Sequence, residues 1–225
     1  MNVTVIIPIK GGHTVKSRLH PDPVLRTSLA KAFARDTVAA VMSASNVGRI
    51  VVVTGDDSTA ACFSAIGCHI VGETPFTVGD RLNMAIIQGR DWAAQRHGDE
   101  PIAIVPGDLP TLTSTVLDEV FAQGLHYPMA YCPDTEGSGT TVLMAATPQH
   151  LKPAYGVGSA AAHRALGAFA LDDIDPRARQ DIDTMTDLFT AQRLGIGPAT
   201  AEVLTRYSAS HHWPSGLDSV VSSSQ

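Results

Sequence analysis

The feature that most constrains the fold is a series of short, almost entirely apolar segments rich in Ile and Val, separated by longer segments with apolar residues at helical spacing. A strand that is apolar at every position is buried on both faces, which is typical of a parallel sheet covered by helices on both sides. The sequence therefore predicts an α/β layer architecture. Strands are expected at residues 3–8, 49–54, 68–72 and 102–105, and helices at residues 24–44, 57–66 and 79–95.

This regular alternation changes in the second half of the chain. A helix is expected over residues 113–122, and the apolar runs at 129–132 and 140–146 are joined only by a glycine-rich connection. Such a pair is expected to run antiparallel, which makes the sheet mixed. Further along, the sequence predicts a helix from Ser159, a strand near residues 169–174 and a helix with Thr184 as its N-cap.

The chain is expected to form one domain. Its 225 residues, with 44% hydrophobic content, are enough to bury a sizeable core. We assign residues 1–207 to this domain. Residues 208–225 carry Ser, Gly, Pro and His without periodicity, so they are expected to form a poorly packed tail.

Composition restricts the partners and the compartment. Only 17% of the residues are charged and the formal net charge is -6, so no basic field is available to hold a nucleic acid, and none is expected. The apolar run at the N-terminus is too short to span a bilayer and follows no basic region, so neither a membrane partner nor a signal peptide is expected. Cys62, Cys68 and Cys132 are odd in number and lack C-x-x-C spacing, which fits a reducing cytoplasm.

Polar residues gather where the expected strands end, which is where open α/β sheets bind their ligands. The first such loop is PIKGGHTVKSRL at residues 8–19, which combines the glycine Gly11 and its neighbour with the cations Lys10, Lys16 and Arg18. Its backbone N–H groups and positive charges could hold a triphosphate. The loop does not match G-x-x-x-x-G-K-[ST], so a flexible surface loop remains the alternative.

Three carboxylates form the second candidate. Asp108 follows the fourth expected strand in IVPGDLP, and Asp181 and Asp183 are spaced as D-x-D, which points both side chains to one face of an extended segment. Carboxylates grouped in this way suit a hard cation such as Mg²⁺. A turn-forming role for Asp108 and a solvated acidic loop for the other two are the alternatives.

The segment GVGSAA, which begins at Gly156, matches the dinucleotide fingerprint G-x-G-x-x-[GA] in form only. That fingerprint requires a strand directly before its first glycine, and residues 148–155 separate the two here. What remains is a glycine turn leading into a helix at Ser159, which could bind a small phosphate or carboxylate. The nine histidines show no metal-binding spacing on a helix, and no G-x-S-x-G motif is present.

Taken together, the chain resembles the 2-phospho-L-lactate guanylyltransferase family, which includes phosphoenolpyruvate guanylyltransferases and serves the biosynthesis of the deazaflavin coenzyme F-420. The resemblance covers roughly residues 3–188. It rests on six blocks in order: VIIPIK with KSRL at 16–19, GDRLNMAI at 79–86, PGDLP at 106–110, GSGTTVL at 137–143, YGVGSAAAH at 155–163 and DIDTMTDL at 181–188. It implies a Rossmann-like three-layer sandwich with a mixed central sheet, a nucleotidyltransferase of the glycosyltransferase-A type.

The resemblance also implies roles for individual residues. Mg²⁺ would be bound by Asp108, Asp181 and Asp183, which with Lys16 would form the catalytic set. The triphosphate would contact Lys10, Gly11, Lys16 and Arg18, and guanine would lie near Asp80 and Asn83. The phosphorylated acid would be held by Thr141, Gly156 and Ser159.

The implied reaction is transfer of GMP from GTP to a small phosphorylated three-carbon acid, with release of pyrophosphate. Some members of the family have Thr-Asn and others Thr-Thr where this chain has Thr140-Thr141, and we favour phosphoenolpyruvate over 2-phospho-L-lactate. Two alternatives stay open: a glycosyltransferase that uses a nucleotide sugar, and a non-catalytic nucleotide-binding regulator. Three metal-ready carboxylates count against the regulator. The sequence leaves the oligomeric state open and is compatible with a homo-oligomer.

Overall fold

The computed structural model describes residues 2–10, 16–74 and 80–210. The strands are β1 (Val3–Pro8), β2 (Val47–Thr54), β3 (His69–Gly72), β4 (Ile102–Ile104), β5 (Met129–Pro133), β6 (Thr140–Ala145) and β7 (Phe169–Ala170). The α-helices are α1 (Pro23–Ser43), α2 (Asp57–Ser64), α3 (Arg81–His97), α4 (Ser114–Gly124), α5 (Ser159–Ala165), α6 (Met185–Leu194) and α7 (Pro198–Ser210). Two 3₁₀ turns, η1 (Pro148–His150) and η2 (Pro176–Ala178), complete the described elements.

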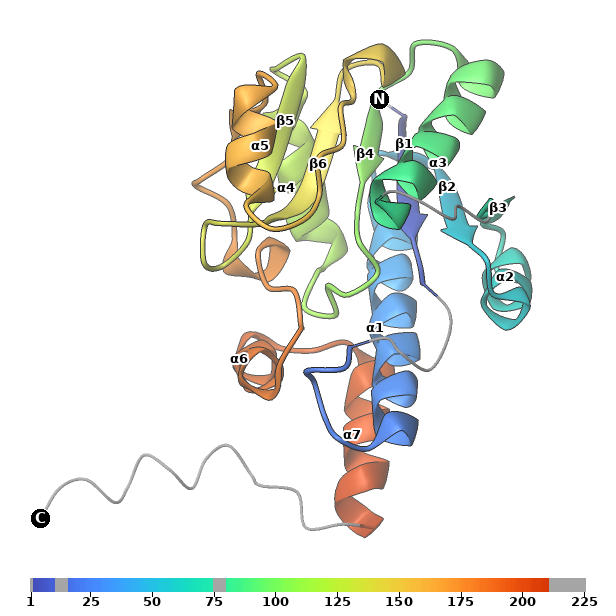
Figure 1. Cartoon of the computed structure of the whole chain (residues 1–225), viewed down its shortest axis with the longest axis vertical. Coiled ribbons are helices and arrows are strands. Elements are labelled where there is room, and N and C mark those ends of the chain that lie inside the picture. Colours follow the sequence, from blue (N-terminus) through green and yellow to red (C-terminus); the bar gives the residue numbers. More distant parts are fainter. Residues whose placement is uncertain (1, 11–15, 75–79, 211–225) are drawn as a thin grey trace, which may run out of the picture.

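All seven strands form one sheet in the order β3-β2-β1-β4-β6-β5-β7 (Figure 1). β1 pairs in parallel with β2 and β4, and β2 pairs in parallel with β3. β6 runs antiparallel to both β4 and β5, and β7 lies parallel to β5. The prediction of a mixed sheet with a local antiparallel pair is therefore confirmed.

Helices cover both faces of the sheet, which gives the expected three layers (Figure 1). The residues of β1 alternate between the two faces: Val5 and Ile7 pack with α1, α2 and α4, while Ile6 packs with α3 and α5. Both faces of the central strands are thus apolar, as their uninterrupted Ile/Val content predicted. None of the helices that the structure describes is long and apolar enough to cross a membrane.

A third apolar cluster lies beyond the sheet, where α1 meets α6 and α7. Leu29 and Phe33 of α1 pack there with Ile182, Leu188 and further residues of α6 and α7. Figure 1 shows α7 lying alongside the lower half of α1. This cluster anchors the segment that carries Asp181 and Asp183 to the long helix α1.

Most predicted boundaries agree with the structure to within about two residues, and two predictions differ more in extent. The strand expected at 169–174 stops at Ala170, because two aspartates and Pro176 follow closely and both residue types are poorly suited to a strand. The helix α7 continues to Ser210, so the first three residues of the predicted tail are helical. The rest of that tail, residues 211–225, lies outside the described residues.

Candidate functional site

The candidate site lies where β1 and β4 end side by side. The chain proceeds outward from β1 to β2 and β3, then returns to the other side of β1 to form β4. The connections after β1 and β4 therefore leave in opposite directions and open a crevice between them. The N-terminal loop follows β1 and the segment with Asp108 follows β4, so the fold brings these two predicted loops together.

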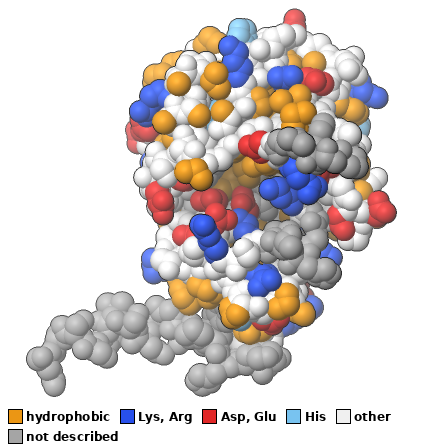
Figure 2. Space-filling model, viewed as in Figure 1, with side chains coloured by type: hydrophobic (Ala, Val, Ile, Leu, Met, Phe, Trp, Pro, Cys, Tyr) orange, Lys and Arg blue, Asp and Glu red, His pale blue; other side chains and the backbone are white. Residues whose placement is uncertain are grey.

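A cavity of about 490 Å³ occupies this crevice, a volume typical of a small-molecule site. Figure 2 shows this face of the molecule hollowed, with acidic and basic side chains around an apolar floor. Three basic residues reach the cavity from the first loop: Lys10, Lys16 and Arg18. Its other lining residues include Phe33, Ala34, Leu82, Asp108 and Asp183. Gly11, the remaining predicted triphosphate contact, lies outside the described residues.

The three predicted metal ligands converge in space. Asp108, Asp181 and Asp183 each present a carboxylate oxygen, and these oxygens all lie within 4.8 Å of one another. One oxygen of Asp108, Oδ1, is buried without a hydrogen-bond partner in the described part of the chain. A buried, unpaired carboxylate oxygen is costly unless a cation or donor reaches it. The donor set and this open oxygen therefore fit a hard divalent cation.

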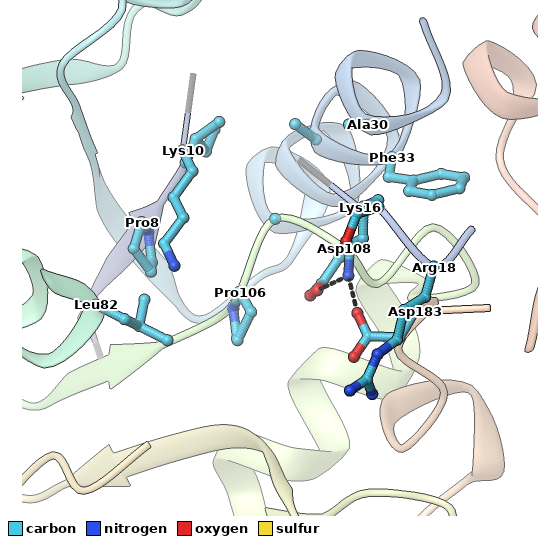
Figure 3. A pocket seen from close by; sticks show the side chains of 14 residues that line it. Pro8, Lys10, Lys16, Arg18, Ala30, Phe33, Leu82, Pro106, Asp108 and Asp183 are labelled. Atoms are coloured by element: carbon cyan, nitrogen blue, oxygen red, sulfur yellow. Dashed lines mark hydrogen bonds and ion pairs between the residues drawn. The ribbon is translucent and has the colours of Figure 1, made fainter. Parts of the chain in front are cut away.

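Lys16 holds the acidic cluster together. Its Nζ donates to Asp108 Oδ2 at 2.6 Å and to Asp183 Oδ1 at 2.5 Å (Figure 3). Burial disfavours the charged form of the lysine, but the Asp108 and Asp183 carboxylates outweigh it and hold the pKa of Lys16 well above its ordinary value. Lys16 also has a φ of 57°, in the left-handed region that non-glycine residues rarely adopt. The ammonium group is therefore a fixed positive charge at the edge of the cavity.

The carboxyl group of Asp181 has a strongly raised pKa. Burial, followed by the negative charge of Asp108, raises the pKa of Asp181 to about 7, against the opposing effect of Lys16. A neutral carboxylic acid here limits the repulsion within the cluster. A cation that binds the cluster must therefore displace a proton from Asp181 near neutral pH.

Asp80 and Asn83 do not point freely into the cavity. Asp80 is the N-cap of α3 and accepts hydrogen bonds from the backbone N–H groups of Leu82 and Asn83. The Asn83 amide accepts from the Tyr155 N–H and donates to the Tyr155 carbonyl, both at 2.9 Å. Asn83 therefore joins α3 to the loop that precedes α5, and its neighbour Leu82 lines the cavity.

The three residues expected to hold the acid lie together but are not among the cavity lining. Thr141 is buried, and its hydroxyl donates to the Ala178 carbonyl at 2.7 Å. Ser159 is also buried, and its backbone N–H donates to the carbonyl of Gly156. Gly156 itself has a φ of 138°, which favours glycine, and faces open space. Of the three, Gly156 is the one whose surroundings leave room for a ligand.

A buried histidine, His163, holds the loop that precedes α5. The Ala154 N–H donates to Nε2 of His163 at 2.9 Å, so Nδ1 carries the proton and donates to the Thr140 hydroxyl. Burial lowers the pKa of His163 to about 4, and the ring is therefore neutral at physiological pH. The sequence alone does not reveal this role of His163, because a single histidine on a helix has no distinctive spacing.

The apolar wall of the cavity was also missed. Ala30, Phe33 and Ala34 lie on one stripe of α1 and line the cavity. Figure 3 shows Ala30 and Phe33 on this helix, near Lys16. The apolar spacing of this helix was recognised, but the pattern alone could not separate residues that face a cavity from residues that face the core.

Comparison with known proteins identifies the family. Residues 25–175 match the MobA-like NTP transferase domain. A phosphoenolpyruvate guanylyltransferase from Streptomyces coelicolor is 40% identical over 92% of this chain and 97% of its own length. The chain belongs to the phosphoenolpyruvate guanylyltransferase family. As a member of this family it is a nucleotidyltransferase.

Solved structures agree with this family at the level of the fold. A protein from Desulfovibrio desulfuricans described as a nucleotide-diphospho-sugar transferase has a TM-score of 0.70 at 15% identity, covering 93% of this chain and 96% of its own. A nucleotidyl transferase from Methanothermobacter has a TM-score of 0.61 at 17% identity, covering 86% of this chain and 97% of its own. The predicted nucleotidyltransferase fold is thus confirmed.

Proposed function

We propose that this nucleotidyltransferase moves GMP from GTP to phosphoenolpyruvate and releases pyrophosphate, as a step in the biosynthesis of the deazaflavin coenzyme F-420. The observation that carries the proposal is the convergence of Lys16 with three carboxylates at the end of a cavity between β1 and β4. The names of the family members support guanylyl transfer to this acid. The close chemical relative 2-phospho-L-lactate is the second candidate acceptor.

Asp108, Asp181 and Asp183 would bind Mg²⁺. Their oxygens already lie within 4.8 Å of one another, and hard carboxylate oxygens are the ligands that this ion takes from proteins. When bound, the ion would neutralise charge on the nucleotide phosphates. Lys16 would contribute a second positive charge on the same side of the cavity, and Lys10 and Arg18 would contact the outer phosphates.

The transfer needs no covalent intermediate on the protein. An oxygen of the acid's phosphate would attack the α-phosphorus of GTP in line, and the bond from that phosphorus to the bridging α–β oxygen would break. The electron pair of the broken bond leaves with pyrophosphate. Since the attacking phosphate is already ionised, the chain has to position the two substrates and balance their charge, and it does not have to remove a proton.

The acid would bind beside the turn at Gly156, with Ser159 and Thr141 behind it. This placement is supported by the open space at Gly156 and by the Asn83 amide, which ties the turn to the helix whose residue Leu82 lines the cavity. Guanine would lie over the start of the same helix, near Asp80. Thr141 would act indirectly. Its hydroxyl donates to the carbonyl of Ala178, three residues before Asp181, and so helps to position the segment that carries this carboxylate.

We also propose that the enzyme works in the cytoplasm. Cys62, Cys68 and Cys132 are all free thiols, which suits a reducing compartment.

The test is pyrophosphate release measured for each combination of GTP, ATP, CTP or UTP with phosphoenolpyruvate or 2-phospho-L-lactate, in the presence of Mg²⁺. GTP with phosphoenolpyruvate should give the highest kcat/KM, and Asp183→Asn should abolish turnover. The exposed Asp173, changed to Asn, is the matched control and should leave turnover intact. Pyrophosphate release with another nucleotide but not with GTP would overturn the proposal, and so would glycosyl transfer from a nucleotide sugar without pyrophosphate release.

A further inference from the structure

The acidic residue Asp187 lies in the first turn of α6, four positions after Asp183, and is not part of the acidic cluster. A single oxygen of its carboxylate, Oδ2, accepts three hydrogen bonds. The donors are the backbone N–H of Asp183 at 3.1 Å, the backbone N–H of Thr184 at 2.7 Å and the hydroxyl of Thr184 at 2.9 Å.

The two contacts with Thr184 belong to the start of helix α6. Thr184 and Asp187 form a reciprocal capping box, in which each side chain binds the backbone N–H of the other. The contact with the Asp183 N–H is not part of that motif. It fixes the peptide group directly before the Asp183 side chain, whose carboxylate is largely exposed and bonded to Lys16.

The same segment is held from its other side by burial. Ile182 is fully buried in the apolar cluster between α1 and α6, next to Leu188. The backbone of Asp183 is therefore fixed between the buried side chain before it and the Asp187 carboxylate after it. An exposed side chain attached to a fixed backbone loses little conformational entropy when it binds a cation.

We propose that Asp187 is a positioning residue, which holds Asp183 so that its carboxylate converges with Asp108 and Asp181 on a divalent cation. This inference rests on the proposed function, since it gives the cluster a metal to bind. The positioning role differs from helix capping in one measurable respect. Loss of a cap lowers stability alone, whereas loss of a positioning contact also lowers the affinity for the metal.

The chain offers a variant that separates the two roles. Thr184→Val removes the capping hydroxyl but leaves Asp187 able to accept from both backbone N–H groups. Asp187→Ala removes all three contacts. Asp118→Ala is a matched control at the other end of the sheet, where that carboxylate accepts from the backbone N–H groups of Ser45 and Asn46 and from the Asn46 amide.

The experiment measures Mn²⁺ binding by electron paramagnetic resonance on the full chain, alone and with GTP, with urea unfolding to establish the folded fraction of each variant. Asp187→Ala should weaken Mn²⁺ binding by about ten-fold or more, the range typical of residues that orient metal ligands. Thr184→Val and Asp118→Ala should lose stability but bind Mn²⁺ within about two-fold of the wild type. If Asp187→Ala does not fold, Asp187→Asn takes its place and should bind about three-fold more weakly, because a neutral oxygen accepts less strongly.

Equal Mn²⁺ affinity in the Asp187 variant and the wild type would overturn the inference. So would a loss of Mn²⁺ affinity in Thr184→Val as large as that in the Asp187 variant. Either result leaves the proposed function standing, provided that the wild type binds Mn²⁺ and Asp183→Asn does not. A wild type that fails to bind Mn²⁺ with or without GTP would remove the metal from the proposed function, and the inference with it.

Discussion

Replacing Lys16 with Met tests whether one ammonium group holds the acidic cluster together. Met has a similar length and no charge, so the cavity wall is kept and the contacts to Asp108 and Asp183 are lost. Asp108 is 26% exposed and Asp183 61%, whereas the lysine side chain is 11% exposed. The contact with Asp108 is therefore the more valuable of the two, because solvent screens the contact with Asp183.

The size of the effect follows from these exposures. A hydrogen bond between charged groups in a partly buried position contributes about 1.5–3 kcal/mol. An ion pair with an exposed carboxylate adds only about 0–1 kcal/mol. We expect Lys16→Met to lower the free energy of unfolding by about 1.5–4 kcal/mol, which for a chain of this size is a fall in Tm on the order of 3–16 °C.

Thermal unfolding in a chelator and in excess Mg²⁺ provides the assay. In chelator the full loss should appear, because Asp108 and Asp183 are left without their ion-pair partner. In Mg²⁺ the loss should shrink, since the bound ion replaces the missing charge and stabilises the folded state. Lys10→Met is the matched control: Lys10 lines the same cavity, but in the described part of the chain it has no ion pair. A Tm of Lys16→Met equal to that of the control, or a loss that Mg²⁺ does not reduce, would show that Lys16 does not hold the acidic cluster together.

Three further perturbations test other parts of the structure. Mn²⁺ affinity should fall as the pH drops below about 7, because the cation must displace the proton of Asp181. Calorimetry in buffers of different ionisation enthalpy should detect the released proton, and binding without proton release would contradict the raised pKa of Asp181. The free energy of unfolding should rise by up to about 3 kcal/mol between about pH 4 and 6.5, because His163 is protonated in the unfolded chain over this range and neutral in the folded one. The variant His163→Gln should reduce this slope, and an unchanged slope would count against a neutral ring. Asp36→Ala should lower the free energy of unfolding in urea by about 2–4 kcal/mol, since the buried Asp36 carboxylate accepts hydrogen bonds from the N–H groups of Ala199 and Thr200 in the first turn of α7. A loss under about 0.5 kcal/mol would show that these hydrogen bonds contribute little.

The sequence predicted those elements whose signals are local. The uninterrupted Ile/Val content of β1 and β2 identified buried strands, and Thr184 was correctly predicted to cap α6. The antiparallel pair β5 and β6 followed from its short glycine-rich connection. Each of these signals lies within a few residues of the element that it predicts.

Features that depend on distant contacts were not predicted. Four of the 13 residues of α7 are Thr or Ser, which are mediocre helix formers. The helix packs against α1 and is held at its start by Asp36, more than 160 positions away, and neither contact is visible in the local sequence. The ion pair of Lys16 with Asp108 spans 92 positions and is visible only once β1 and β4 are known to be neighbours. The capping role of Asp80 could have been read from the sequence, because an aspartate directly before a helical pattern is a common N-cap.

Guanylyl transfer is tested most directly by following the phosphorus atoms of GTP. The enzyme is incubated with Mg²⁺, phosphoenolpyruvate and GTP labelled with ³²P at either the α or the γ position, and the products are separated. Label from the α position should appear in a guanosine diphospho-linked acid, and label from the γ position should appear only in pyrophosphate. Transfer of the γ label to the acid, or an α label that stays in GTP while the acid is consumed, would contradict attack at the α-phosphorus and with it the proposed use of this cavity.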